Sequence, residues 1–468
     1  MNKFYITTTL PYVNADPHIG FALEIVQTDA IARYHRFGGD EVIFNFGTDE
    51  HGLKIYRKAK EQGKSPQAYC DEYAVKWNKL KEALNLSYTN FIRTTDKHHI
   101  DAAQKFWERC LKNGDIYKKK YKTKYCVGCE LEKTDSETEK GKCPIHPNLK
   151  LEIIEEENYF FRFSKYQKPL LDFYEKNPDF VIPQTKFNEI KNFVKNGLED
   201  FSVSRLKSKM PWGIDIPCDP DQVMYVWFDA LINYISTLGW PKDEKNFHNF
   251  WPGIQVAGKD NLRQQTAIWQ AMLMSAGLPN SKQVFIHGFI TINDQKISKS
   301  LGNVINPFEL VEKYGIDALR YFLLAKINPY GDSDFSVEKF EDAYNADLAN
   351  GLGNLVARVA KLAELNKIII ADKKETLSIP KYNGHLDRFE FNLALETIWQ
   401  DIKKLDTDIN NDKPWETHDK NKIANYAIRL KKVTIALQPF LPQTAEKILQ
   451  QFKGPEISSQ PPLFPRLK

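Results

Sequence analysis

The sequence predicts an α/β protein: a doubly wound parallel sheet, an insertion between the two halves of that sheet, and an all-helical region after it. Three patterns lead to this prediction. Apolar strand-like segments alternate with amphipathic helical stripes over residues 1–115 and again over 221–335, as in βαβ units. A cysteine cluster and charged runs mark the intervening residues 116–220. Helical stripes alone fill most of residues 336–468, which predicts a helical bundle.

The first expected strand covers residues 4–10 and leads into a helix that begins near the tetrapeptide His18-Ile19-Gly20-Phe21. The free amides and the dipole at a helix N-terminus favour phosphate groups. Gly20 has no Cβ, so a base or a phosphate can approach the backbone closely. His18 alone would equally suit a capping or core position, but together with Gly20 it predicts a phosphate contact.

A second buried strand, over residues 42–46, runs into the polar segment Gly47-Thr48-Asp49-Glu50-His51-Gly52. Doubly wound sheets place their ligand sites beyond the carboxyl ends of parallel strands. We therefore expect this polar segment to lie at a ligand site.

The insertion contains Cys126-x-x-Cys129 and Cys143-x-x-His146, separated by residues 130–142. Two short loops that each present a pair of soft or borderline ligands are typical of a tetrahedral zinc site. Four protein ligands leave no open position, so the metal is expected to be structural. The alternative is a set of reduced structural cysteines. The basic run over residues 118–124 fits a solvated edge strand and a nucleic-acid contact equally well.

The second half of the sheet begins with an expected strand over residues 224–228, a helix that carries Tyr234, and a strand over 254–258. A further strand over 284–289 precedes the segment Lys296-Ile297-Ser298-Lys299-Ser300. Lysines are usually solvated surface charges. Their position between a buried strand and Gly302-Asn303 instead indicates a mobile loop that holds a leaving polyphosphate.

Length, charge and cysteine content limit the classes of protein to which the chain can belong. A chain of 468 residues has room for two to four domains, and its net charge of +4 does not by itself indicate nucleic-acid binding. Six cysteines do not suggest a disulfide scaffold. No signal-peptide pattern and no membrane-length apolar run occur, so a cytoplasmic location without membrane association is expected.

Together these segments resemble the methionyl-tRNA synthetases, a family of class I aminoacyl-tRNA synthetases. The resemblance covers the chain from end to end and rests on six motifs in family order, namely Pro11-Tyr12-Val13-Asn14 before the HIGH-type segment, the Gly47–Gly52 segment, the cysteine cluster, Glu156–Phe161, Tyr225–Ala230 and the KMSKS-type lysine loop. It implies a Rossmann-type catalytic domain in two halves (1–115 and 221–335), a connective insertion with a zinc knuckle (116–220), and an α-helical anticodon-binding domain with a C-terminal tail (336–468).

The same resemblance implies site residues. It places the triphosphate and the catalytic contacts at His18, Lys296 and Lys299, with Gly20 and Asp260 completing the ATP site. It places the methionine pocket at Leu10, Tyr12, Asp49, Trp227, Ala230, Tyr234 and Gln265. It places the zinc at Cys126, Cys129, Cys143 and His146, and the reading of the anticodon at Asn354, Arg358 and Trp415. A stacking indole with polar groups beside it suits splayed RNA bases.

Three positions depart from the family pattern. Phe21 stands in place of the second histidine of the HIGH-type motif, and Asn261 in place of an aliphatic residue. The pair Gln264-Gln265 stands where the family has Phe-His. We expect an intact nucleotide site and an altered side-chain pocket, in which Asn261 or Gln264 accompanies the carbonyl of Gln265.

The implied activity is ligation of L-methionine to tRNA(Met) in two steps, through methionyl-adenylate, with Mg²⁺ accompanying ATP. Both attacking groups belong to substrates, so catalysis would rest on alignment and charge stabilisation. A monomer is expected. A small adenylyltransferase on the same fold is the alternative enzyme, and a non-catalytic tRNA-binding paralogue is the alternative from another class.

Overall fold

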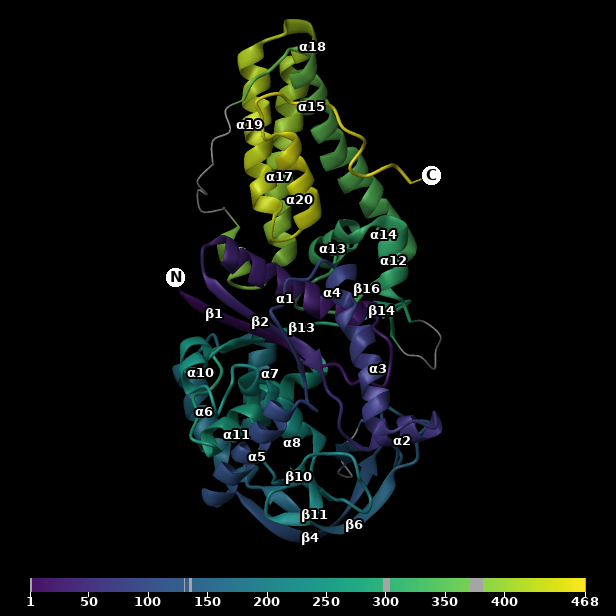
Figure 1. Cartoon of the computed structure of the whole chain (residues 1–468), viewed down its shortest axis with the longest axis vertical. Coiled ribbons are helices and arrows are strands. Elements are labelled where there is room, and N and C mark those ends of the chain that lie inside the picture. Colours follow the sequence, from purple (N-terminus) through teal and green to yellow (C-terminus); the bar gives the residue numbers. More distant parts are fainter. Residues whose placement is uncertain (1, 130, 134–136, 298–303, 371–381, 468) are drawn as a thin grey trace.

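The computed structural model describes residues 2–129, 131–133, 137–297, 304–370 and 382–467. The molecule is elongated, with a helical bundle at one end, a parallel sheet in the middle and an antiparallel sheet at the other end (Figure 1). The predicted fold class is confirmed by this architecture. No helix in these ranges combines the length and the apolarity that crossing a membrane requires.

The central sheet has six parallel strands in the order β3-β2-β1-β12-β13-β7. Their bounds are β1 Lys3–Thr8, β2 Glu41–Thr48, β3 Asn90–Arg93, β7 Val181–Ile182, β12 Ile254–Gly258 and β13 Gln283–His287. The two halves of the chain meet where β1 pairs with β12, Ile6 opposite Ile254. The strand order reverses there, so a crevice opens beyond the carboxyl ends of β1 and β12.

Helices cover both faces of the first half of this sheet. The buried side of α1 is mostly apolar but includes Glu24 and Asp29, and the helix ends where Gly39 adopts a positive φ of 89°. The helices of this half are α1 Ile19–Phe37, α2 Leu53–Glu61, α3 Pro66–Asn78, α4 Leu80–Ala83 and α5 Lys97–Lys112. His18 is the N-cap of α1 in an extended conformation, which places its side chain at the crevice end of the helix.

The insertion contains a four-stranded antiparallel sheet in the order β5-β4-β6-β8. Its elements are β4 Ile116–Cys126, β5 Leu131–Lys133, β6 Glu152–Phe161, η2 Phe163–Tyr166, α6 Gln167–Lys176, α7 Gln184–Lys195 and β8 Phe201–Ser202. Between α6 and α7 the chain returns to the central sheet as β7, which pairs with β13. The segment predicted as one insertion therefore also supplies an edge strand of the central sheet.

The basic run lies in β4. Residues of β6 pair with it along its whole length, whereas β5 pairs only with Lys124–Cys126. Lys120 lies opposite Glu157 and Lys122 opposite Glu155. Opposite charges across neighbouring strands stabilise a sheet. This arrangement favours the solvated-edge interpretation of the run over a nucleic-acid contact.

A small antiparallel sheet, β10-β11-β9, leads into the second half of the catalytic core. The elements here are β9 Ser204–Leu206, β10 Asp215–Ile216, β11 Asp219–Met224, α8 Val226–Leu231, α9 Asn233–Ser236, α10 Glu244–Phe250, η3 Lys259–Asn261, the π-helical turn η4 Gln264–Ile268 and α11 Trp269–Ser275. The strand expected over residues 224–228 is wrong, because β11 ends at Met224 and Val226 already begins α8. A short apolar run has no periodicity that separates a strand from a helix.

A third sheet, β15-β14-β16, follows β13 and leads to the bundle. Its strands and the next helices are β14 Ile290–Ile292, β15 Gln295–Lys296, α12 Pro307–Tyr314, α13 Ile316–Ala325, β16 Ser333–Asp334 and α14 Val337–Ala343. The bundle consists of the π-helical segment η6 Tyr344–Gly353, α15 Asn354–Leu365, α16 Asn383–Leu386, α17 Phe391–Asp412, α18 Pro414–Thr417, α19 Lys420–Leu437 and α20 Pro442–Gln451. The tail beyond α20 lies against the bundle, where Phe464 packs on Tyr344 at 5.9 Å between ring centroids.

One buried arginine joins the bundle to the central sheet. Arg320 of α13 has no exposed surface, and its guanidinium lies 2.8 Å from a carboxylate oxygen of Asp29 on α1. It also donates hydrogen bonds to the backbone carbonyls of Leu84, Pro439 and Phe440, the last two in the turn between α19 and α20. Four segments that are distant in sequence therefore meet at one side chain.

Candidate active site, metal centre and anticodon surface

The loops that follow β1 and β2 are bonded to each other above the sheet. The backbone N–H of Asp49 donates to the carbonyl of Pro11 at 2.9 Å, and that of Val13 donates to the carbonyl of Asp49 at 3.2 Å. The hydroxyl of Tyr12 donates to the carbonyl of His51 at 2.7 Å. The loop with Leu10 and Tyr12 and the buried carboxylate of Asp49 are thus held together at the crevice.

The other expected pocket residues come from the helices after β11 and β12. Trp227 and Ala230 lie on α8, Tyr234 on α9 and Gln265 on η4. Between the first two, Asp229 reaches Nδ1 of His51 at 3.1 Å, which ties α8 to the loop after β2. Burial raises the pKa of the Asp229 carboxyl, and the His51 contact acts against that rise.

Gln265 donates from Nε2 to the hydroxyl of Tyr234 at 2.8 Å. Its carbonyl oxygen accepts from Nε2 of Gln255 on β12 at 2.9 Å. The expectation that Asn261 or Gln264 would accompany this carbonyl is wrong. Asn261 is partly buried and donates from Nδ2 to Asp260 instead, at 3.2 Å. Gln255 lies in a strand interior, a position that sequence reasoning assigns to packing.

The two halves of the expected ATP site lie together. The backbone N–H of Ile19 donates to the carbonyl of Ile305 at 3.0 Å. A Cβ at Gly20 would lie 3.1 Å from His18 Cε1 and Nδ1, and 3.9 Å from Cδ1 of Ile297. The lysine loop therefore begins and ends against the start of α1. Lys296 closes β15, whereas Lys299 lies outside the described residues.

Phe21 packs inward from the same turn. Its ring meets Trp77 of α3 edge-on at 4.9 Å and lies 6.4 Å from Phe46 of β2, measured between ring centroids. The departure from the family pattern thus replaces a polar group with an aromatic contact between α1 and α3. Asp260 lies in η3, directly after β12.

Sequence reasoning missed a buried ion pair beneath the crevice. Glu24 of α1 accepts hydrogen bonds from the backbone and the hydroxyl of Thr9, at 2.9 and 2.6 Å, and its second oxygen lies 3.0 Å from Nε2 of His287. Burial lowers the pKa of His287, but the hydrogen bond and the charge of Glu24 outweigh it, so this pKa lies above its ordinary value. The sequence carries one signal for this ion pair, because a glutamate falls on the stripe of α1 that the helical period predicts to be buried.

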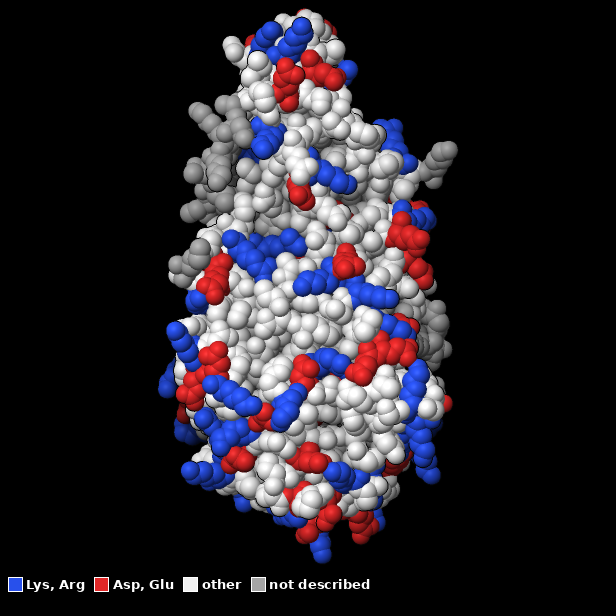
Figure 2. Space-filling model, viewed as in Figure 1, with Lys and Arg blue, Asp and Glu red and all other residues white. Residues whose placement is uncertain are grey.

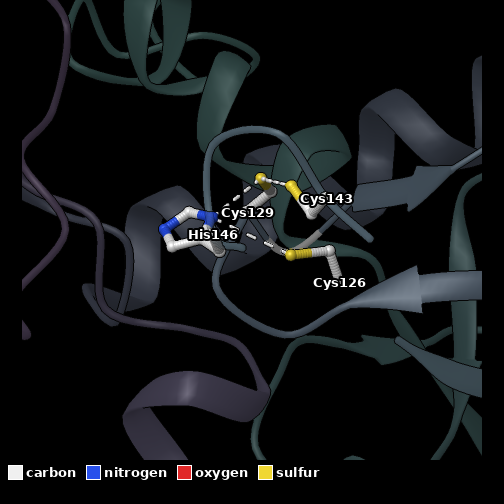
Figure 3. A group of neighbouring side chains, drawn as sticks. All are labelled: Cys126, Cys129, Cys143 and His146. Atoms are coloured by element: carbon white, nitrogen blue, oxygen red, sulfur yellow. Dashed lines mark hydrogen bonds between the residues drawn. The ribbon is translucent and has the colours of Figure 1, made fainter. Parts of the chain in front are cut away.

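The expected metal ligands converge in one cluster (Figure 3). The ligand atoms of Cys126, Cys129, Cys143 and His146 all lie within 4.8 Å of one another. Nδ1 of His146 lies 3.2 Å from Sγ of Cys129 and 3.8 Å from Sγ of Cys126. A Cβ at Gly128 would lie 2.6 Å from the imidazole ring, so only glycine leaves room for it. The donor set and its spacing fit a tetrahedral ion.

The expected anticodon residues share one surface of the bundle. Arg358 of α15 reaches Asp406 at 2.5 Å and Asn410 at 2.7 Å, both on α17. Its guanidinium lies 5.9 Å from the ring centroid of Trp415 on α18. Asn354 precedes Arg358 by four residues on α15 and is exposed on the same face.

Trp415 is 47% exposed, which is unusual for so large an apolar side chain. Basic and acidic side chains are interspersed over the visible face of the molecule, without a uniformly basic surface (Figure 2). The feature that marks the bundle surface is therefore an exposed aromatic ring beside an oriented arginine, rather than charge alone.

Comparison with known proteins assigns the family. The family model described as tRNA synthetases class I (M) matches residues 4–152 and 147–360. The chain is 40% identical over 482 residues to the methionine–tRNA ligase of Thermotoga maritima, across 98% of this chain and 76% of that protein. It is 39% identical over 508 residues to the methionine–tRNA ligase of Brucella suis, across 99% and 98% of the two.

Solved structures agree with the sequence relatives. Methionyl-tRNA synthetase of Mycobacterium tuberculosis in complex with methionyl-adenylate has a TM-score of 0.93 to this chain at 35% identity, with all of both chains covered. The free form of the same enzyme has a TM-score of 0.86 at 31% identity. With its parallel sheet, its cysteine cluster and its helical bundle, the chain belongs to the methionyl-tRNA synthetase family of class I tRNA synthetases.

Proposed function

We propose that this chain ligates L-methionine to tRNA(Met) through methionyl-adenylate and releases AMP and diphosphate. The observation that carries the proposal is the contact between the start of α1 and the lysine loop, seen at Gly20, Ile297 and Ile305. It is supported by the activity for which the relatives are named and by the likeness to a structure bound to methionyl-adenylate. For a protein that charges tRNA we also propose a cytoplasmic location.

In the first step the methionine carboxylate attacks the α-phosphorus of ATP and displaces pyrophosphate. Asp49 holds the substrate ammonium, while Leu10, Tyr12, Trp227 and Ala230 enclose the side chain. His18, Lys296 and Lys299 stabilise the charge on the departing pyrophosphate, and Asp260 binds the ribose. Mg²⁺ accompanies the ATP. Lysine suits this task because a point charge on a flexible stem can follow the leaving group.

ATP–pyrophosphate exchange with each of the twenty amino acids tests the proposal. Exchange that depends on methionine alone is the expected result. Exchange with another amino acid would assign a different substrate to the pocket. No exchange at all, in protein that still binds tRNA, would identify a non-catalytic paralogue.

For the cysteine cluster we propose one structural Zn²⁺ held by Cys126, Cys129, Cys143 and His146. The ion would join the end of β4 to the loop before β6 and would take no part in the reaction.

Metal analysis of protein purified without chelator is expected to give about one zinc per chain. Cys129→Ala should lose the metal and loosen the insertion while the central sheet remains folded, because the cluster lies outside that sheet. Cys218→Ala, which changes an exposed cysteine outside the cluster, should retain the metal. A metal-free parent protein would contradict the assignment, as would full zinc retention in Cys129→Ala.

Trp415→Ala is expected to weaken charging of tRNA and to leave ATP–pyrophosphate exchange unchanged, since exchange needs no tRNA. The loss of one base stack corresponds to roughly 1–3 kcal/mol. Ile428→Ala, at another exposed apolar residue of the bundle, is the matched control and should affect neither step. A parallel fall of both activities in Trp415→Ala would assign the indole to packing rather than to RNA.

A further inference from the structure

One uninterrupted helix runs from the catalytic half of the molecule to the expected anticodon surface. It consists of α14, η6 and α15 and covers residues 337–365 (Figure 1). Its middle part, the ten residues Tyr344–Gly353 of η6, is π-helical. π-Helices are rare, occur mostly as single turns and are frequent at functional sites. A π-helical segment of this length therefore depends on contacts that hold it in that form.

The π-helical segment ends at the residues that face the anticodon surface. The backbone N–H of Asn354 donates to the carbonyl of Ala349, five residues earlier, so Asn354 closes the last π turn. Arg358 follows one α-helical turn later on the same face. A π turn closes on the fifth residue and an α turn on the fourth, so the two forms rotate the following helix differently about its axis. The hydrogen-bond register of η6 therefore sets the direction in which Asn354 and Arg358 point.

Gly353 fits the π form because it has no side chain. A Cβ at this position would lie 2.9 Å from the carbonyl oxygen of Leu348, five residues earlier. Real Cβ atoms do not approach an oxygen so closely, so a side chain at residue 353 would displace this carbonyl. At Gly351 the corresponding separation, from the carbonyl of Ala346, would be 3.4 Å, which is within van der Waals contact. The π form therefore tolerates a side chain at residue 351 but not at residue 353.

The C-terminal tail contacts both ends of η6. Phe464 is 8% exposed, and its ring meets that of Tyr344, the first residue of η6, edge-on at 5.9 Å between centroids. Cδ2 of the same ring would lie 3.7 Å from a Cβ at Gly353, the last residue of η6. The backbone N–H of Leu467 donates to Oδ1 of Asn345 at 3.0 Å. The tail, yellow in Figure 1, thus crosses the long helix at its π-helical part.

We propose that Phe464 is a positioning residue for anticodon reading, which holds η6 in the π form and so directs Asn354 and Arg358 toward the RNA. The proposal rests on the proposed function and deepens it. It predicts that anticodon selectivity depends on a buried ring that does not itself reach the RNA. If the ring served only to pack the tail, its removal would lower stability and leave selectivity unchanged.

The test measures kcat and KM for the charging of two tRNA(Met) transcripts, one with the natural anticodon and one with a single anticodon base replaced. Phe464→Ala should raise the KM for the natural transcript about tenfold, the effect of one lost hydrogen bond to a charged group, with little change in kcat. The KM for the altered transcript should change far less, because its anticodon contacts are already impaired. ATP–pyrophosphate exchange should stay at the parent value, since exchange needs no tRNA.

Two further variants separate positioning from packing. Gly353→Ala changes the backbone of η6 without altering the tail and should narrow the preference for the natural anticodon in the same way. Gly351→Ala is its matched control and should leave that preference unchanged. Phe464→Leu keeps an apolar side chain in the same space and should restore most of the preference.

Ile457→Ala is the matched control within the tail. Ile457 is 3% exposed and follows Glu456, which pairs with Ile369 beyond the far end of α15. This substitution also removes a buried apolar side chain, so it should lower the temperature of thermal unfolding. The preference for the natural anticodon should stay at the parent value.

A double substitution tests whether the tail acts through Arg358. Arg358→Ala alone should reduce the preference for the natural anticodon. If Phe464 acts by directing Arg358, then adding Phe464→Ala should reduce that preference little further. Losses that add in full would overturn the proposal.

An unchanged anticodon preference in Phe464→Ala and Gly353→Ala would also overturn it, as would equal losses for the two transcripts. A parent protein without methionine-dependent exchange, or one that charges both transcripts equally, would instead overturn the proposed function. If Phe464→Ala does not fold, Gly353→Ala decides the question.

Discussion

His18→Ala is expected to slow methionine-dependent ATP–pyrophosphate exchange by about a hundredfold to a thousandfold. Removal of one preorganised donor from a developing negative charge costs about 2.7–4 kcal/mol of transition-state stabilisation. The imidazole lies at the start of α1, against Gly20 and beside the residues that flank the lysine loop. The KM for methionine should change little, because the contact strengthens only as the pyrophosphate departs.

The structure offers two controls for this substitution. Thermal unfolding of His18→Ala, measured beside the kinetics, separates a loss of folding from a loss of catalysis. Gly20→Ala should give a smaller loss, since the added Cβ lies 3.1 Å from the imidazole and displaces it without removing it. Parent-like exchange in His18→Ala would remove the histidine from the mechanism.

Arg320→Met is expected to lower the free energy of unfolding by about 3–5 kcal/mol, as when one partner of a buried ion pair is removed. It leaves the buried Asp29 with one ion-pair partner fewer, and three backbone carbonyls lose their donor. Denaturant unfolding measures the effect. Arg429→Met breaks a partly exposed ion pair with Asp408 and should change the free energy of unfolding little.

The loss of stability in Arg320→Met should depend on pH. Burial raises the pKa of Asp29, but the charges of Arg320 and Arg33 outweigh it, so this pKa lies below its ordinary value. A carboxyl of that kind stabilises the fold above the unfolded-state pKa and loses this contribution as pH falls through the lowered, folded-state pKa. The difference between parent and Arg320→Met should therefore be largest near neutrality and shrink in acid.

A double substitution measures the interaction between Asp29 and Arg320. Asp29→Asn added to Arg320→Met should recover part of the lost stability, because it removes the uncompensated charge and keeps an oxygen that accepts from Ser87. Strictly additive losses would show that the two side chains stabilise the fold independently.

Functional groups whose residues lie close together in the sequence could be predicted from it. His18 and Gly20 stand at a helix start because a strand precedes them and an amphipathic stripe follows. The spacing of the four metal ligands fixes their proximity with little help from the rest of the fold. Such features depend on a few neighbouring residues, and the structure brings each of these groups together.

The remaining features depend on distant contacts. Nothing near Gln265 in the sequence identifies Gln255 as its partner, because η4 and β12 meet only in the folded sheet. Strand β7 has two residues and becomes a strand only beside β13. The ion pair of Glu24 and His287 likewise joins opposite ends of the catalytic core. Pairing across long separations leaves no periodic signal.

The order of strands in the central sheet also constrains synthesis of the chain. β1 can pair with β2 as soon as residue 48 has left the ribosome, but its other edge stays open until β12 emerges, after residue 253. An unpaired apolar edge is a site where nascent chains aggregate. The nascent protein must therefore shield one edge of its first strand throughout translation of the insertion, and a chaperone that binds extended apolar segments would act in that interval.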